Sequence, residues 1–167
     1  MNIHPPIVAA IPEALHDIFV SGYYADNVVG RRMRAHKNWG SRDRKAFAEA
    51  VYDIVRWWRT LHFLLGWPWQ DGAGKDYSLE QMSEFFLAWL VLKDRPIPEW
   101  METEPTTEIL DRLQELKNAD RATKESIPDW LDELASSEIK GPWDDCLAAL
   151  NDKAPVFLRI ISLKIDA

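Results

Sequence analysis

Cysteine is almost missing from this sequence, which contains one, Cys146, among 167 residues. A single cysteine excludes an internal disulfide and any metal or iron–sulfur site built from several cysteines. Glycine is scarce as well, with seven residues, and the chain has neither a glycine-rich phosphate loop nor a G-x-G-x-x-G fingerprint. Its apolar runs fall far short of the roughly 18 residues that a membrane helix needs. Residues 1–17 lack the basic region of a secretory signal. We therefore expect a cytoplasmic protein.

The side chains that carry most enzyme chemistry show no recognisable arrangement. The four histidines stand far apart and match no metal-ligand spacing. Cys146 has no histidine near it in the sequence, and we expect it to face the core of a short helix. Asp144 and Asp145 are adjacent and would point in different directions on a helix, which does not favour a two-carboxylate active site. We assign no catalytic residue and no metal site to this chain.

Charge is distributed unevenly. The chain has 20 basic and 27 acidic residues, a net charge of −7. Residues 26–59 nevertheless hold nine basic and four acidic side chains, a balance of +5, so the remainder carries −12. Seven of the nine basic residues lie between Arg31 and Lys45. Such a cluster suits contacts with the phosphates of a nucleic acid.

The candidate RNA-binding residues come from this cluster and include a tryptophan that could stack on an unpaired base. They are Arg31, Arg32, Arg34, Lys37, Trp39, Arg42 and Lys45. Arg44 and Arg56 stand beside acidic residues, and we interpret them as structural braces. The alternative for the whole cluster is an ordinary solvated basic face, because surface ion pairs contribute only about 0–1 kcal/mol.

Apolar residues recur mainly at steps of three and four, which predicts helices. A third helix, capped by Ser41, is the clearest, because a continuous apolar stripe runs from Phe47 to Leu61. Asp26 or Asn27 is the candidate cap of the second helix, and Ser78 begins a capping box with Gln81. The predicted helices cover residues 7–20, 25–36, 41 to about 65, 78 to about 93, 107–118, 128 to about 140 and 143–150.

Nine tryptophans are an unusually large number for a chain of this length. Most of them fall on helical apolar stripes, so we interpret them mainly as core anchors and only secondarily as stacking platforms for bases. In the helix that begins near Pro128, for example, Trp130, Leu131 and Leu134 are expected to form the apolar face.

Residues 155–165 differ from everything before them, because they are rich in β-branched and aromatic side chains and predict a strand. A lone strand cannot satisfy its own backbone hydrogen bonds. Three arrangements would solve this problem: pairing with a second copy of the chain, packing on the helices as an arm, or membership of a second domain that is absent here. The last would make the chain a fragment of a longer protein.

Two stretches of the sequence resemble a known family. The first runs from Ala25 to Arg56 and contains SRDRKAF (41–47) and VYDIVR (51–56). The second contains SIPDWL (126–131), ALN (149–151), AP (154–155), LR (158–159) and LK (163–164). In this order and spacing they resemble the N-terminal, NusB-like region of the Sun/Fmu (RsmB/NOP-type) ribosomal RNA cytosine methyltransferases. One departure is Ile161, where the family usually has asparagine.

The resemblance implies an all-α, NusB-like bundle, with about six or seven helices over the whole chain. Residues 1–125 would form the NusB-like domain, and residues 126–167 would form bridging helices and a strand that leads into a catalytic domain. It also implies that this chain recognises ribosomal RNA, and that the absent domain binds S-adenosylmethionine and methylates carbon 5 of a cytosine. The family's two catalytic cysteine motifs do not occur in this chain, and Cys146 matches neither. We therefore expect the isolated chain to transfer no methyl group.

Two other functions fit the same residues. One is a free-standing NusB-like adaptor that binds RNA and uses its acidic remainder to contact protein partners. The other is a helical docking module that binds no nucleic acid. The dependence of RNA affinity on salt separates them, because only a phosphate-binding surface releases counterions on binding.

Overall fold

The computed structural model describes residues 4–69, 76–101 and 103–152. These residues form α-helices and short 3-10 helices and contain no strand, which confirms the all-α class. The predicted strand at 155–165 lies outside the described residues. In chain order the elements are α1 (Pro5–Phe19), α2 (Ala25–Ala35), α3 (Ser41–Arg56), α4 (Trp58–Leu65), α5 (Leu79–Leu92), η1 (Glu99–Met101), α6 (Thr107–Glu115), η2 (Leu116–Asn118), α7 (Arg121–Lys124), α8 (Asp129–Glu138) and α9 (Trp143–Asn151).

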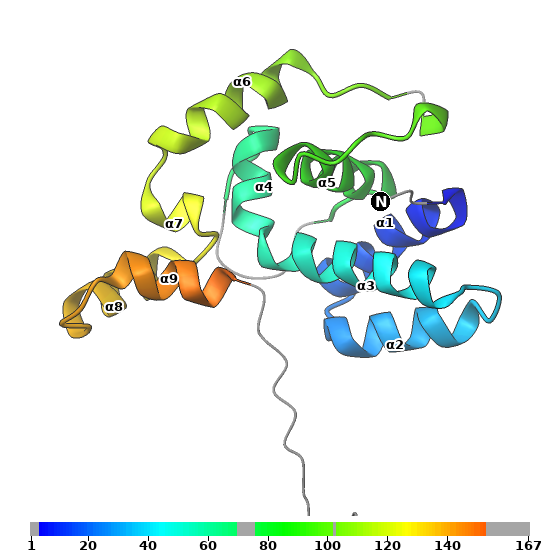
Figure 1. Cartoon of the computed structure of the whole chain (residues 1–167), viewed down its shortest axis with the longest axis horizontal. Coiled ribbons are helices and arrows are strands. Elements are labelled where there is room, and N and C mark those ends of the chain that lie inside the picture. Colours follow the sequence, from blue (N-terminus) through cyan, green and yellow to red (C-terminus); the bar gives the residue numbers. More distant parts are fainter. Residues whose placement is uncertain (1–3, 70–75, 102, 153–167) are drawn as a thin grey trace, which may run out of the picture.

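Helix α5 lies at the centre of the fold, packed against α1, α3, α4 and α6 (Figure 1). Its sequence is apolar nearly all round, and every residue from Phe85 to Leu90 is buried, as expected for a helix covered on all sides. Ser78 caps α5 by accepting a hydrogen bond from the backbone N–H of Gln81, whose side chain accepts one from the backbone N–H of Ser78. The predicted capping box is thereby confirmed.

The predicted third helix is two helices. Continuity from residue 41 to about 65 was wrong, because the chain bends at Trp57 and α4 turns away from the axis of α3 (Figure 1). The bend sends two adjacent tryptophans to different partners. The ring of Trp58 stacks between Phe19 and Phe85, at centroid distances of 3.6 and 3.9 Å. The ring of Trp57 lies beneath the ammonium of Lys93, 4.2 Å from its centroid.

Two helix caps also differ from the prediction. Gly40 rather than Ser41 is the N-cap of α3. The backbone N–H of Gly40 donates a hydrogen bond to the side-chain carboxylate of Asp43 at 3.1 Å. Tyr24 occupies the N-cap position of α2, so Asp26 lies in the first turn of the helix instead of capping it. The acidic side chains near the start of each helix interact favourably with the positive end of the helix dipole, which stabilises the helix.

Helices α7 to α9 form a smaller layer beside the main core and have a small core of their own, made of Ala135, Trp143 and Leu147 with Ile127 packed against it. Two expectations about this layer were wrong. Trp130 and Leu134 are 58% and 46% exposed on α8, because Ala135 faces the small core in their place. Cys146 is exposed on α9.

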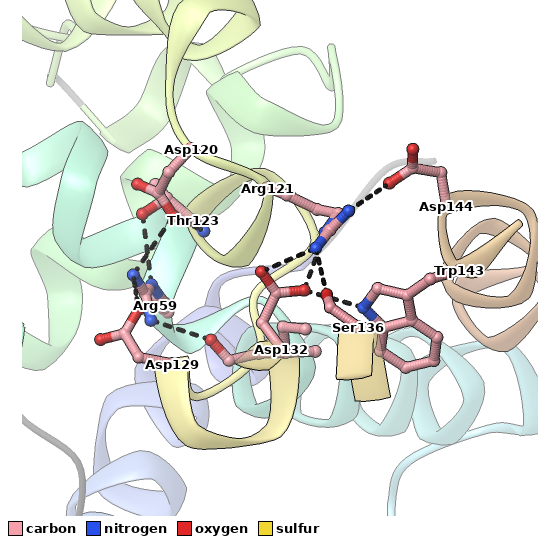
Figure 2. A network of polar contacts seen from close by, with 10 residues as sticks. Arg59, Asp120, Arg121, Thr123, Asp129, Asp132, Ser136, Trp143 and Asp144 are labelled. Atoms are coloured by element: carbon pink, nitrogen blue, oxygen red, sulfur yellow. Dashed lines mark hydrogen bonds and ion pairs between the residues drawn. The ribbon is translucent and has the colours of Figure 1, made fainter. Parts of the chain in front are cut away.

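One arginine holds this layer to the rest of the fold, and a second holds the three helices of the layer together (Figure 2). The buried guanidinium of Arg59, on α4, donates to Thr123 Oγ1 at 3.2 Å and to the carbonyl of Ile127 at 3.0 Å. It also forms ion pairs with Asp120 at 3.3 Å and Asp129 at 2.8 Å.

The second arginine, Arg121, connects α7 to the two helices that follow it. It pairs with Asp132 on α8 at 2.8 Å and with Asp144 on α9 at 3.2 Å. Asp132 also accepts a hydrogen bond at 2.8 Å from the indole N–H of Trp143. All of these groups have partners within the fold, so we interpret the network as structural.

Candidate nucleic-acid interface

The turn between α2 and α3 is organised by one arginine. Arg44 reaches back from the first turn of α3 and donates to three backbone carbonyls at the end of α2 and in the turn. These are Trp39 (3.0 Å), Met33 (2.9 Å) and His36 (3.4 Å). The last carbonyls of a helix have no partner within the helix, and a guanidinium satisfies several of them at once. Arg44 is therefore a brace, as the sequence indicated.

Trp39 also serves to fix this turn. Its side chain is 5% exposed and packs in the core, stacked on His36 at a centroid distance of 4.2 Å and tilted against Phe47 at 5.0 Å. The sequence suggested that this tryptophan stacks on an unpaired base. The structure places it inside the fold instead of on the surface where a base would reach it.

Arg31 and Arg32 lie on the face of α2 that meets α1. Arg31 pairs with Asp17 at 2.7 Å, and Arg32 pairs with Asp17 at 2.8 Å and with Glu13. Burial disfavours the charge of Arg32, but hydrogen bonds and attraction from these carboxylates outweigh burial and raise the pKa of its guanidinium. Both arginines thus have partners within the fold, which makes them weaker candidates for contacts with phosphate.

The other four predicted residues form an exposed group around the turn. Arg34 lies in the last turn of α2 and Lys37 follows that helix, whereas Arg42 and Lys45 lie at the start of α3. Among the described residues, Arg34, Lys37 and Arg42 have no carboxylate partner within ion-pair distance, and Lys45 has only a loose pair with Glu49 at 3.8 Å. We call these four residues the basic corner.

The basic corner and helices α8 and α9 lie at opposite ends of the molecule (Figure 1). Residues 31–45 contain seven basic side chains and one acidic, whereas residues 129–152 contain seven acidic and one basic. The charge separation seen along the sequence is therefore also a separation in space. A nucleic acid would be drawn to one end and repelled from the other.

The two stretches that carry the family resemblance meet at the other end of α3. The side chain of Arg56 donates to Asn151 Oδ1 at 2.7 Å and to the carbonyl of Leu150 at 2.6 Å. The amide of Asn151 in turn donates to Glu125 Oε2 at 2.7 Å. Arg56 is thus a brace between α3 and α9, as the sequence indicated, and it joins the VYDIVR and ALN segments.

Comparisons were made with protein-family models, curated proteins and solved structures. None of the three found a match for this chain. The function proposed below therefore depends on the charge, exposure and contacts of the chain's own residues and on the motifs that resemble the methyltransferase family.

Sequence reasoning missed two basic residues near this junction. Lys93 and Arg95 follow α5 and line a groove with residues of α3 and α9, although more than 35 residues separate them from Arg56 in the chain. Their only signal in the sequence was a position just after an apolar helix, where a basic residue also complements the helix dipole. Within the described part of the chain, no cluster of side chains fits a metal ion, and no helix is long and apolar enough to cross a membrane.

Proposed function

We propose that this chain is the RNA-binding, substrate-recognition region of an S-adenosylmethionine-dependent ribosomal RNA cytosine-5 methyltransferase. The observation that carries the proposal is the basic corner, where exposed cations without close carboxylate partners gather at the end of the molecule opposite its acidic helices. Cations that have no internal partner keep their charge available for phosphate.

Support for the fixed geometry of this corner comes from the turn beneath it. Arg44 and the buried ring of Trp39 hold the end of α2 against the start of α3. The exposed side chains therefore project from a rigid base, and less conformational entropy is lost when RNA binds. The two arginines paired to α1 strengthen the same base.

The methyl-transfer part of the proposal rests on the family resemblance. In that family S-adenosylmethionine and the catalytic cysteines belong to a separate domain, so we assign neither to this chain. The supporting contact within this chain is the one between Arg56 and Asn151, because it joins two segments that carry the resemblance. NusB-like architecture is part of the same proposal.

Charge reversal tests the RNA-binding role. The variant Arg34→Glu/Lys37→Glu/Arg42→Glu changes the net charge by six units but touches none of the internal ion pairs described above. We expect it to lose at least about tenfold in affinity for a fluorescein-labelled single-stranded RNA measured by anisotropy, because several phosphate contacts become repulsive.

A matched control changes the net charge by the same amount elsewhere. Lys117, Lys124 and Lys140 are exposed and lie outside the basic corner. Their reversal to glutamate should alter affinity less than about threefold, because distant surface charges are screened by salt. Equal losses in the two variants, or no loss in either, would contradict RNA binding at the basic corner.

A second candidate is a free-standing NusB-like adaptor that binds RNA and a protein. The exposed Trp130 and Leu134 on the acidic helix α8 favour it, because exposed apolar side chains rimmed by charge mark protein contacts. Sequencing the native transcript beyond the codon for Ala167 separates the two. A reading frame that continues into an S-adenosylmethionine-binding domain supports the methyltransferase, and a stop codon supports the adaptor.

A further inference from the structure

A polar groove of about 510 Å³ lies where α3 ends, between α3, the residues after α5 and the end of α9. It is separate from the basic corner, and the function proposed above assigns no ligand to it. Its lining combines basic, acidic, amide and phenol side chains, and consists of Glu49, Tyr52, Asp53, Arg56, Lys93, Arg95, Leu150, Asn151 and Asp152.

Two cations of the groove are held by aromatic rings. The ammonium of Lys93 lies 4.2 Å from the ring centroid of Trp57, and the guanidinium of Arg95 lies 4.6 Å from that of Trp89. A cation held over a ring keeps its charge, because the ring does not neutralise it as a carboxylate would. Neither Lys93 nor Arg95 has an ion pair with a described residue, so both charges are available to an anion.

The surroundings of Lys93 favour the arrival of an anion. Burial lowers the pKa of its ammonium, attraction to Asp53 opposes this effect, and repulsion from Arg95 and Arg56 adds to it. A bound phosphate would offset the repulsion of Lys93 by Arg95 and Arg56.

Tyr52 gives the groove a flat, exposed ring. Its side chain is 42% exposed, and its hydroxyl donates to Asp26 on α2 at 3.0 Å, which fixes the orientation of the ring. Exposed tyrosines of this kind serve as platforms on which unpaired bases stack.

The groove is aligned with the basic corner along one face of α3. Lys45, Tyr52 and Arg56 are spaced seven and four residues apart, which places them on the same side of the helix. At about 1.5 Å per residue, Lys45 and Arg56 are separated by roughly 16 Å along the helix axis. A single strand of a few nucleotides spans this distance.

We propose that the groove is a second RNA subsite, which holds one nucleotide of a single strand that also crosses the basic corner. Lys93 and Arg95 bind its phosphate and Tyr52 stacks on its base. This inference rests on the proposed RNA-binding function. It extends the binding surface from the basic corner alone to a path that runs along α3 from the basic corner to the groove.

The acidic residues of the groove are consistent with a nucleotide. Glu49 contacts Lys45, and Asp53 accepts a hydrogen bond from the indole N–H of Trp89 at 3.4 Å. The carboxylate of Asp152 offers acceptors for the ribose hydroxyls and for the edge of the base. Inorganic phosphate alone would use only the cations, so the mixed lining favours the larger ligand.

The test uses the full chain and a labelled single-stranded RNA of about 12 nucleotides, long enough to cover both sites. The variant Lys93→Gln/Arg95→Gln keeps polar side chains with shorter stems and removes both charges. We expect its affinity to fall about tenfold. Tyr52→Ala should cause a loss of similar size, whereas Tyr52→Phe keeps the ring and should bind within about threefold of the wild type.

Three results would overturn the inference. In the first, the wild type binds RNA and reversal of the basic corner weakens it, but the groove variants bind normally; the proposed function then stands and the subsite fails. In the second, polyglutamate binds as tightly as RNA and responds to the same variants, so the groove is a general anion site. In the third, the wild type does not bind RNA, and the proposed function fails as well. Urea unfolding of each variant shows that the loss comes from the groove and not from misfolding.

Discussion

At the scale of single residues, Arg59 connects several segments of the fold. It is buried on α4, and its contacts reach α7, the loop that follows and the start of α8. Arg59→Met keeps much of the volume but leaves these acceptors without their donor. We expect the free energy of unfolding to fall by about 2–3 kcal/mol in urea denaturation, because hydrogen bonds to a charged group contribute about 1.5–3 kcal/mol. The partner carboxylates are exposed and regain water, which limits the loss.

Two further variants separate the geometry of Arg59 from its charge. Arg59→Lys keeps the charge but not the planar fork of donors, so it should recover less than half of the lost stability. Arg34→Met is the matched control, because Arg34 is exposed and has no ion pair among the described residues. It should change stability by less than about 0.5 kcal/mol. Losses of equal size at the two positions would contradict this account of Arg59.

Asp132 makes stability depend on pH. Its hydrogen bond to Arg121 lowers the pKa of its carboxyl, burial opposes this effect, and the indole N–H of Trp143 and the charges of Arg121 and Arg59 lower the pKa further. A carboxyl whose pKa is lower in the folded chain stabilises the fold above its unfolded pKa, near about 4, and the contribution disappears as pH falls through the folded value.

Because the pKa of Asp132 is lowered in the folded chain, acid should reduce the stability of the wild type more than that of a variant without this carboxyl. Below pH of about 4, the wild type should lose stability more steeply than Asp132→Asn, and the two curves should run parallel between about pH 6 and 8, where the carboxyl is ionised in both states. Urea unfolding at a series of pH values measures the slopes. Parallel curves across the acid range would show that Asp132 has the same pKa in the folded and unfolded chain.

At the scale of elements, the end of α4 depends on a glycine. Gly66 closes the helix in the left-handed conformation with φ of +67°, and a Cβ at this position would lie 2.3 Å from the guanidinium carbon of Arg112 on α6. Gly22 has a similar φ of +74° but open space around it. Replacing either glycine by alanine would therefore strain the backbone, but only at Gly66 would the new Cβ also clash with a side chain.

We expect Gly22→Ala to lower the free energy of unfolding by about 1 kcal/mol, from the left-handed conformation alone. Gly66→Ala should lose up to about 0.5 kcal/mol more, because the guanidinium of Arg112, at the end of a flexible side chain, must move aside. In the Gly66→Ala/Arg112→Ala double variant the clash is absent, so the loss relative to Arg112→Ala alone should return to the value for Gly22. Thermal or urea unfolding measures all four proteins, and equal losses for the two single glycine variants would contradict the clash.

Helix α5 and the turn between α2 and α3 show what local sequence can and cannot predict. The capping box of α5 is a local signal, and it was predicted correctly. The bend at Trp57 was missed, because no proline or glycine marks it and the apolar stripe runs on without a break. The bend arises from tertiary packing, as Trp58 stacks between Phe19 and Phe85, and local propensity contains no information about those partners.

Tertiary contacts also separate the predicted binding residues that remain exposed from those that have partners within the fold. Sequence placed all of them in one basic cluster, but it could not show that the carboxylates of α1 face Arg31 and Arg32 or that Trp39 turns inward. Partners distant in the chain decide which cations remain exposed. Lys93 and Arg95 were not predicted because they lie far from the basic cluster in the sequence, and only the fold brings them next to α3.

For the molecule as a whole, the opposite charges of its two ends should orient it on RNA before any close contact forms. The field of the basic end attracts phosphates, and that of α8 and α9 repels them. This attraction weakens with ionic strength, because the Debye length falls to about 8 Å at physiological salt. Salt dependence therefore measures how many phosphates the bound state neutralises.

The number of phosphates separates binding at the corner alone from the longer path through the groove. On single strands, log affinity falls with log salt by about 0.7 for each phosphate neutralised. Four phosphates at the basic corner give a slope of about −2.8, and the one phosphate held by Lys93 and Arg95 makes it about −3.5. The Lys93→Gln/Arg95→Gln variant should have the shallower slope expected for the corner alone, whereas the wild type should have the steeper one. Anisotropy titrations over a range of potassium chloride concentrations measure both slopes. A wild-type slope of about −2.8 that the variant leaves unchanged would confine the RNA to the corner, and a slope near zero would remove phosphate binding from the function of this chain.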